Sequence, residues 1–228
     1  MSSRRDRARD NNPDLTVLGF PGPAELRRRL PRLILGIIPL GVGIGMMVEA
    51  RLGVSPYDVL HQGIADHTGL SFGTVVILLG LLVLLLWIPL GQRFGIGTVI
   101  NTLTVGLIVD AFLDWSPDPG SLALRWVYLL VGILIIAFGV GLYIGAGLGP
   151  GPRDGLMTGI AAKGYPLWLV RTGLELTALL AGWLLGGDVG IGTLLFAFGI
   201  GPLGHFFLLR LHLGVGGGDP DPTATIGE

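Results

Sequence analysis

The chain of 228 residues contains no cysteine, and only 14% of its residues are charged. Without cysteine there is no disulfide framework, no thiolate nucleophile and no cysteine-ligated metal site. Soluble domains carry about 25% charged residues, so this composition argues against a soluble protein. The charge is also uneven, because eight of the 15 Lys and Arg residues precede residue 33.

What the sequence has is apolar length: half of its residues are hydrophobic and the mean hydropathy is +0.71. Six runs can cross the roughly 30 Å of hydrocarbon in a bilayer: residues 33–50, 71–90, 96–113, 126–146, 167–185 and 191–209. Forty glycines without an every-third-residue period indicate close helix packing. We therefore predict an all-α polytopic membrane helix bundle with six transmembrane helices in contact with the lipid bilayer.

Two short stretches between these runs share one helix-start pattern. Each has Ser or Gly, then Pro, then Asp two positions later: Ser55, Pro56 and Asp58 in the first, and Gly151, Pro152 and Asp154 in the second. Ser and Gly suit an N-cap, and Pro suits the first helical position because its missing N–H is not needed there. We predict short non-spanning helices over about 55–68 and 151–163. They could lie on the membrane surface or re-enter the membrane.

The two halves of the chain are related by a repeat. A shift of 96 positions superposes the two helix starts, and a shift of 95 superposes two Gly-Ile-Gly-Thr turns: Gly95, Gly97 and Thr98 with Gly190, Gly192 and Thr193. Each half thus contains three spans and one short helix. Because three is odd, the second half enters the membrane from the opposite side, so we predict inverted repeats. Inverted repeats are typical of secondary transporters, whose sites lie between the repeats.

These residues resemble the YczE/YyaS/YitT family of bacterial integral membrane proteins. The likeness rests on the run 148–157, on its partner around Pro56 and Asp58, and on the two Gly-Ile-Gly-Thr turns, and it covers about residues 33–212. The membrane-only, YczE-like type is the nearest, because the chain lacks the cytoplasmic domain of some YitT-like members. The resemblance implies a protein of the bacterial plasma membrane and supplies no catalytic residues.

The basic residues also predict topology. Positively charged segments favour the cytoplasmic side, so the N-terminus is expected in the cytoplasm, and six crossings return the C-terminus there. We divide the chain into a disordered basic cytoplasmic tail with a surface helix (1–32), membrane repeat 1 (33–113), membrane repeat 2 (122–212) and a disordered tail (213–228). The result is a multi-pass plasma-membrane protein.

Asp58 and Asp154 are the first candidate site residues, because the repeat gives them equivalent positions at helix starts. Two such carboxylates could bind a cation or a proton, or orient a polar solute. Alternatively, each could only cap its helix by accepting unpaired N–H groups of the first turn.

Arg171 and Glu175 lie one turn apart within the fifth span, where the aligned residues of the first half, Val76 and Gly80, are apolar. Ionisable groups within spans are costly and are functional candidates by default. The pair could line the solute path with Arg171 holding an anionic group. It could equally be a self-neutralised pair that stabilises helix packing.

Two patterns predict packing and anchoring. Gly199, Gly201 and Gly204 in the last span predict close helix contact. Tryptophans near span ends predict anchoring at the membrane interface: Trp87, Trp115, Trp126 and Trp168.

The functional prediction is a transporter or permease for a small solute or ion, with Asp58, Asp154, Arg171 and Glu175 along its path. The alternative is a non-transporting membrane scaffold that supports a partner. No coherent nucleophile, acid/base pair or metal-ligand set is recognisable, so we expect no enzyme, no catalytic residue, no metal and no cofactor. We expect no nucleic-acid partner, and a homo-oligomer or a membrane partner stays open.

Overall fold

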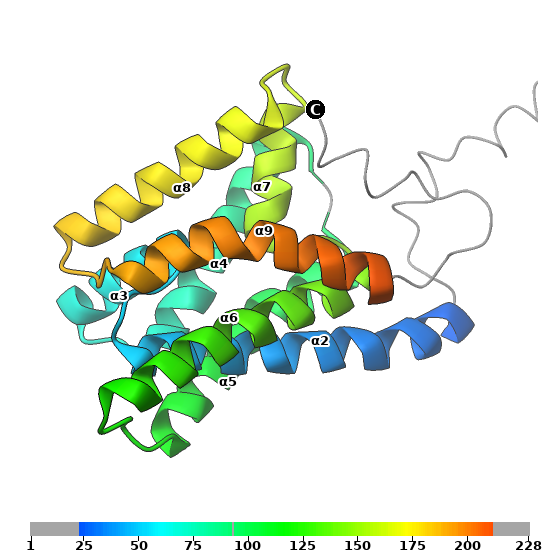
Figure 1. The fold of residues 1–228 in the computed structure, drawn as a ribbon. Helices are drawn as coiled ribbons and strands as arrows, with labels where there is room; N and C mark the ends of the chain where they lie inside the picture. Colours follow the sequence, from blue (N-terminus) through cyan, green and yellow to red (C-terminus); the bar gives the residue numbers. More distant parts are fainter. Residues whose placement is uncertain (1–22, 93, 212–228) are drawn as a thin grey trace, which may run out of the picture.

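The computed structural model describes residues 23–92 and 94–211, and every regular element within them is an α-helix (Figure 1). Six helices are long and apolar enough to span a membrane: α2 (Pro23–Ala50), α4 (Phe72–Leu90), α5 (Ile96–Trp115), α6 (Leu122–Gly145), α8 (Leu167–Leu184) and α9 (Ile191–Leu211). The prediction of an all-α bundle with six spans is therefore confirmed. The two disordered tails that we predicted fall largely outside the described residues.

Two short helices, α3 (Pro56–Thr68) and α7 (Pro152–Ala161), follow the first span of each half. Their starts are built as the sequence predicts. Ser55 is the N-cap of α3 and its Oγ accepts the N–H of Asp58 at 3.2 Å, while Gly151 is the N-cap of α7. The segment expected as a surface helix before residue 33 is continuous with the first span as part of α2.

The centre of the bundle is the crossing of α2 with α6, at which glycines replace side chains. A Cβ on Gly36 would lie 2.9 Å from the carbonyl oxygen of Gly139, and one on Gly43 would lie 2.8 Å from that of Gly132. Residue numbers therefore rise along α2 as they fall along α6, so the two helices run antiparallel (Figure 1). On the outside, α5 packs on α2 and α9 packs on α6.

The Gly-Ile-Gly-Thr turns join the two halves. The N–H of Gly97 donates to the carbonyl of Leu148 at 2.9 Å, and the N–H of Gly192 donates to that of Leu52 at 2.8 Å. Each turn thus hydrogen-bonds to the loop of the other half that lies just before that half's short helix. Gly53 and Gly149, which follow these carbonyls, have φ of +101° and +118°, a region that favours glycine.

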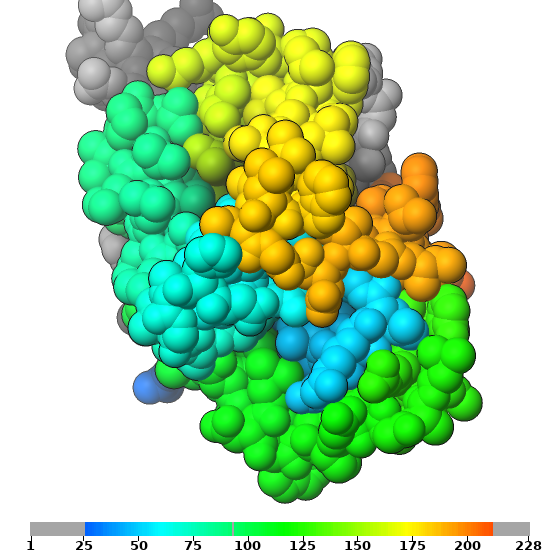
Figure 2. Space-filling view, turned by 90° about the vertical axis from the view of Figure 1, so that its left-hand side faces the viewer, coloured from blue at the N-terminus to red at the C-terminus, as the bar shows by residue number. Residues whose placement is uncertain are grey.

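Each short helix packs on a long helix of the other half, α3 on α8 and α7 on α4. In Figure 2 the cyan surface of α3 adjoins the gold surface at the end of α8. Size is complementary in both contacts, because Gly182 of α8 faces Val59 of α3, whereas Gly155 of α7 faces Trp87 of α4.

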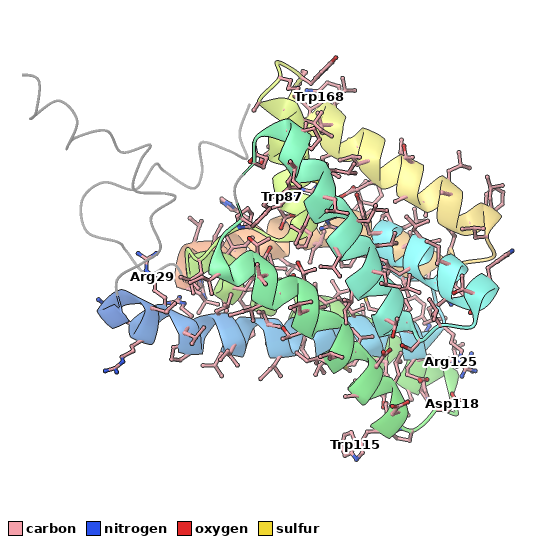
Figure 3. All side chains as sticks on the ribbon, turned by 180° about the vertical axis from the view of Figure 1, so that it is seen from behind. Arg29, Trp87, Trp115, Asp118, Arg125 and Trp168 are labelled. Carbon is pink, nitrogen blue, oxygen red and sulfur yellow. The ribbon has the colours of Figure 1, made fainter. Side chains whose placement is uncertain are left out.

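Trp87 corrects one expectation. It is 0% exposed, and its Nε1–H donates to the carbonyl of Pro152 at 3.0 Å, so it packs against α7 and is no interface anchor. Trp115 and Trp168, by contrast, are 83% and 62% exposed and project from opposite ends of the bundle (Figure 3). Their positions agree with interfacial anchoring.

The last two helices of each half, α4 with α5 and α8 with α9, pack differently in the two halves. α4 and α5 meet closely at Gly73 and Gly106, where a Cβ on either glycine would collide with the other's backbone. α8 and α9 hardly touch. If Gly201 or Gly204 carried a Cβ, no described atom of a neighbouring residue would lie within 4 Å of it. Within the single described chain, Gly201 and Gly204 therefore do not make the close helix contact that we predicted.

Candidate functional site

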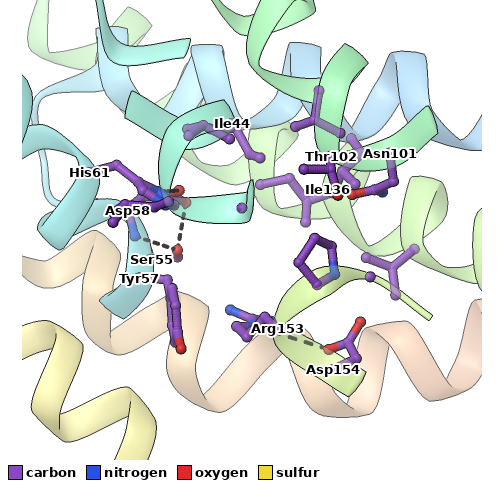
Figure 4. Close-up of a pocket in the computed structure, with 18 of the residues that line it drawn as sticks. Ile44, Ser55, Tyr57, Asp58, His61, Asn101, Thr102, Ile136, Arg153 and Asp154 are labelled. Atoms are coloured by element: carbon purple, nitrogen blue, oxygen red, sulfur yellow. Dashed lines mark hydrogen bonds and ion pairs between the residues drawn. The ribbon is translucent and has the colours of Figure 1, made fainter. Parts of the chain in front are cut away.

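A cavity of about 180 Å³ lies where α3 and α7 begin, within the membrane-spanning bundle (Figure 4). One wall is polar and comes from the starts of the two short helices. The opposite walls are mostly aliphatic and come from α2, α4, α5, α6 and α9. α8 contributes no residue to the lining.

The lining consists largely of residues that correspond between the two halves. Spacings of 95 or 96 positions relate seven pairs of lining residues: Leu40 and Ile136, Ile44 and Val140, Ser55 and Gly151, Tyr57 and Arg153, Asp58 and Asp154, Asn101 and Phe196, and Val105 and Ile200. The cavity is therefore enclosed by equivalent positions of both halves. The two aspartates singled out from the sequence lie in the wall of one space.

Asp58 occupies the more buried part of the polar wall. Its Oδ2 accepts a hydrogen bond from Ser55 Oγ at 2.5 Å, and its Oδ1 lies 3.0 Å from Nδ1 of His61. The side chains of Asp58 and His61 are only 9% and 12% exposed. The start of α3 thus holds a Ser–Asp–His cluster in which the carboxylate has polar partners on both oxygens.

Asp154 is tied to the end of α6. Its Oδ2 accepts the hydroxyl hydrogen of Tyr143 at 2.7 Å, and the same hydroxyl oxygen accepts the N–H of Gly151 at 3.1 Å. Tyr143 therefore bridges the carboxylate and the backbone at the helix start. The contacts of both aspartate side chains are thus with other side chains, and not with the N–H groups that simple capping of their own helices would use.

Arg153 is the cation of the cavity. Its guanidinium carbon lies 5.3 Å from the centre of the Tyr57 ring, and its Nε lies 4.0 Å from Asp154 Oδ1, beyond hydrogen-bonding distance. Figure 4 shows Tyr57 and Arg153 side by side at the cavity. Within the described part of the chain, Arg153 donates no hydrogen bond, so its N–H groups are available to a solute.

The surroundings keep both of these groups protonated. Burial raises the pKa of the Tyr57 hydroxyl. The nearby Arg153 cation opposes this increase, and the Glu175 carboxylate adds to it. Burial also lowers the pKa of Arg153, but the carboxylates of Asp154, Glu175 and Asp58 together raise it by more, so the net shift is upward. The cavity therefore presents a neutral phenol and a permanently charged guanidinium.

Arg171 and Glu175 do not line the cavity. They pair with each other on α8, with Nε and Oε1 3.2 Å apart, and their side chains are 46% and 23% exposed. Their counterparts on α4, Val76 and Gly80, do line it. The structure thus brings together two of the four path residues proposed from the sequence and leaves the other two outside.

Several polar lining residues were missed, among them Tyr57, Asn101, Tyr143 and Arg153. The repeat pairs Tyr57 with Arg153 next to the two aspartates, and that register was the available signal. Asn101 is an amide within a membrane span and is 8% exposed, with no hydrogen-bonding partner among the residues described. A polar side chain in a span is costly when unpaired, and that alone marked it as a candidate.

The described residues hold no group of three or more His, Asp or Glu side chains that could bind a metal ion.

Comparison with known proteins identifies relatives over most of the chain. An uncharacterized protein of Haemophilus influenzae is 41% identical over 177 residues, covering 77% of this chain and 81% of that protein. The uncharacterized membrane protein YczE of Bacillus subtilis is 35% identical over 187 residues, or 81% and 87% of the two chains. YyaS of the same organism is 26% identical over 179 residues, or 76% and 89%. No solved structure matches the chain.

Residues 27–208 match a family described as a family of unknown function, DUF6198. The resemblance inferred from the helix starts and turns is therefore confirmed for YczE and YyaS. The chain belongs to the DUF6198 family and is a YczE-like membrane protein.

Proposed function

We propose that this protein is a transporter that carries a small solute through the cavity between its two halves. The observation that supports this most is the presence of Asp58 and Asp154, 96 positions apart, in the polar wall of one cavity inside a membrane bundle. A scaffold needs no such space, because a bundle is stabilised by close packing.

The same proposal treats the halves as inverted repeats and α3 and α7 as re-entrant helices. The antiparallel crossing of α2 and α6 supports it, as do the equivalent contacts of α3 with α8 and of α7 with α4. Transporters with inverted repeats bind their solutes at the repeat interface and expose them alternately to the two sides. We place the protein in the bacterial plasma membrane with both termini cytoplasmic, as its basic N-terminal segment favours.

The chemistry of the lining limits the solute. Arg153 and Asn101 have hydrogen-bond donors that no described residue uses, whereas both aspartates already have polar partners. Opposite them are aliphatic side chains such as Ile44 and Val140. The solute that fits is small, with an oxygen acceptor for Arg153 and an apolar part for the aliphatic wall. No step in this function calls for a catalytic residue or a cofactor.

Flux through purified protein in liposomes tests the proposal. The panel consists of small carboxylates, zwitterions and amines, with a trapped pH-sensitive dye to detect coupled proton movement. We expect flux for at least one solute, and a fall of about tenfold or more in Asp58→Asn and Asp154→Asn. Each substitution disturbs the hydrogen bonds that hold the polar wall, and a loss of about 1.4 kcal/mol corresponds to a tenfold change.

Asp66→Asn is the matched control, because Asp66 lies exposed on the same helix as Asp58. Its flux should equal that of the unaltered chain. Flux that is insensitive to both cavity substitutions would remove the site from the path. A folded protein that moves none of these solutes would favour the scaffold alternative.

A further inference from the structure

The two halves differ in where their third helix lies. α4 lines the cavity with Val76, Leu79, Gly80 and Val83, whereas none of the corresponding residues of α8 reaches it: Arg171, Leu174, Glu175 and Ala178. The four positions are related by the same spacing of 95 that aligns the turns. We propose a second conformation in which the two halves exchange arrangements: α4 separates from α5, α8 packs on α9, and Arg171 and Glu175 enter the cavity wall as solute-contacting residues.

The first support is that α8 already makes one of the two main helix contacts that α4 makes: α8 packs on the short helix α3 as α4 packs on the short helix α7. Trp87 of α4 packs on Gly155 of α7, and the corresponding residues, Gly182 of α8 and Val59 of α3, pack on each other. Leu185 next to Gly63 likewise corresponds to Leu90 next to Gly159. Only the contact with the following helix is missing, so a rotation about this shared contact point would restore the full correspondence.

The second support is the bare face of α9. On α5, Thr102 is 3% exposed and Gly106 is buried, because α4 covers both. The corresponding residues of α9, Ala197 and Gly201, are exposed. Both are small, and small residues at this spacing permit helices to approach closely. The surface needed to receive α8 is therefore present, and no residue of 23–92 or 94–211 covers it.

The third support is the contact between α8 and α7. α8, which carries Arg171 and Glu175, already packs on α7, the helix that supplies Arg153 to the cavity wall. Movement of α8 onto α9 would place the Arg–Glu pair in the cavity wall, at positions that correspond to Val76 and Gly80 of α4. The solute would then meet a second guanidinium in one state only, and its affinity would differ between the states, as a transport cycle requires.

This inference rests on the proposed function for its purpose, but its structural part can be tested alone. The natural chain has no cysteine, so introduced pairs report without background. A Cβ on Gly80 would lie 3.9 Å from Cβ of Thr102, within the range of a disulfide. Gly80→Cys with Thr102→Cys should therefore crosslink α4 to α5 in the present conformation.

Glu175→Cys with Ala197→Cys is the equivalent pair on α8 and α9, and it should crosslink only in the second conformation. Oxidation in membranes, followed by maleimide counting of the remaining thiols, measures both pairs. We expect the second pair to form as well, and to stop forming when the first pair is also present and oxidised. Thr172→Cys with Gly201→Cys is a second reporter of the same contact, in case the first disturbs folding.

A separate measurement tests whether Glu175 enters the cavity wall. A charged methanethiosulfonate reagent should modify Glu175→Cys from the aqueous cavity, and modification should slow by about tenfold when the Gly80–Thr102 positions are locked by their disulfide. Unchanged modification would overturn the assignment of Glu175 to the wall. Failure of both α8–α9 pairs, while the α4–α5 pair forms, would overturn the movement. Crosslinking without any solute flux would instead count against transport and leave the movement intact.

Discussion

Replacement of Tyr143 by Phe tests the link between the end of α6 and the start of α7. The hydroxyl donates to Asp154 at 2.7 Å and accepts from Gly151 N–H at 3.1 Å, and the residue is 3% exposed. The substitution removes only this oxygen. It leaves a buried N–H without a partner and a carboxylate without its donor.

The expected loss follows from these two contacts. A buried donor left unpaired costs about 1–3 kcal/mol, and a hydrogen bond to a charged group contributes about 1.5–3 kcal/mol. Hydrogen bonds between membrane helices average only about 0.6 kcal/mol, because partners are also found in the unfolded state. Asp154 is 39% exposed at its side chain, so solvent replaces part of its loss. We therefore expect the free energy of unfolding to fall by about 2 kcal/mol in total.

The assay is unfolding in mixed detergent micelles, followed by tryptophan fluorescence and far-UV circular dichroism. Tyr128→Phe is the control, because the Tyr128 hydroxyl has one contact, to Ser116 Oγ at 3.2 Å, in a partly buried position. It should lose about 0.5 kcal/mol. Equal losses in the two variants would refute the claim that the Tyr143 bridge holds the start of α7.

Other predictions concern single contacts. Gly155→Ala should cost about 1–3 kcal/mol in the free energy of unfolding through collision with Trp87, and less when combined with Trp87→Phe, as denaturant titration would show. Arg153→Gln should weaken thermal stabilisation by an anionic solute by about tenfold in concentration, whereas Arg51→Ala, which breaks an exposed pair with Asp118, should change stability by less than about 0.5 kcal/mol. Burial raises the pKa of Tyr57 above its usual 10.0, so the folded chain retains a proton that the unfolded chain loses, and stability should fall as the pH rises above that value. Tyr57→Phe should reduce this alkaline loss in a pH-dependent unfolding series.

Much of the fold follows from local signals in the sequence. The spans are set by apolar length, and the short helices by Ser55, Pro56 and their second-half counterparts. The repeat register also identified Asp58 and Asp154 as equivalent positions, and both of them line the same cavity. These features depend on neighbours in sequence or on the repeat, so they can be read without coordinates.

The rest depends on contacts between distant segments. Trp87 sits at a span end like the other tryptophans, and only the glycine at position 155 of another helix gives it a buried site. Arg171 and Glu175 look like cavity residues because the repeat aligns them with lining positions, yet the placement of α8 keeps them outside. A repeat fixes which residues correspond. It does not fix which conformation each half adopts.

The reciprocal bonds between Leu52 and Gly192 and between Leu148 and Gly97 have a consequence for biogenesis. When the first three spans have entered the bilayer, the carbonyl of Leu52 cannot reach its partner, the N–H of Gly192, until the final span arrives. This contact between the halves therefore forms only when almost the whole length has been synthesised. Quality-control proteases that attack unassembled membrane segments therefore have their best opportunity on truncated chains that end before residue 192.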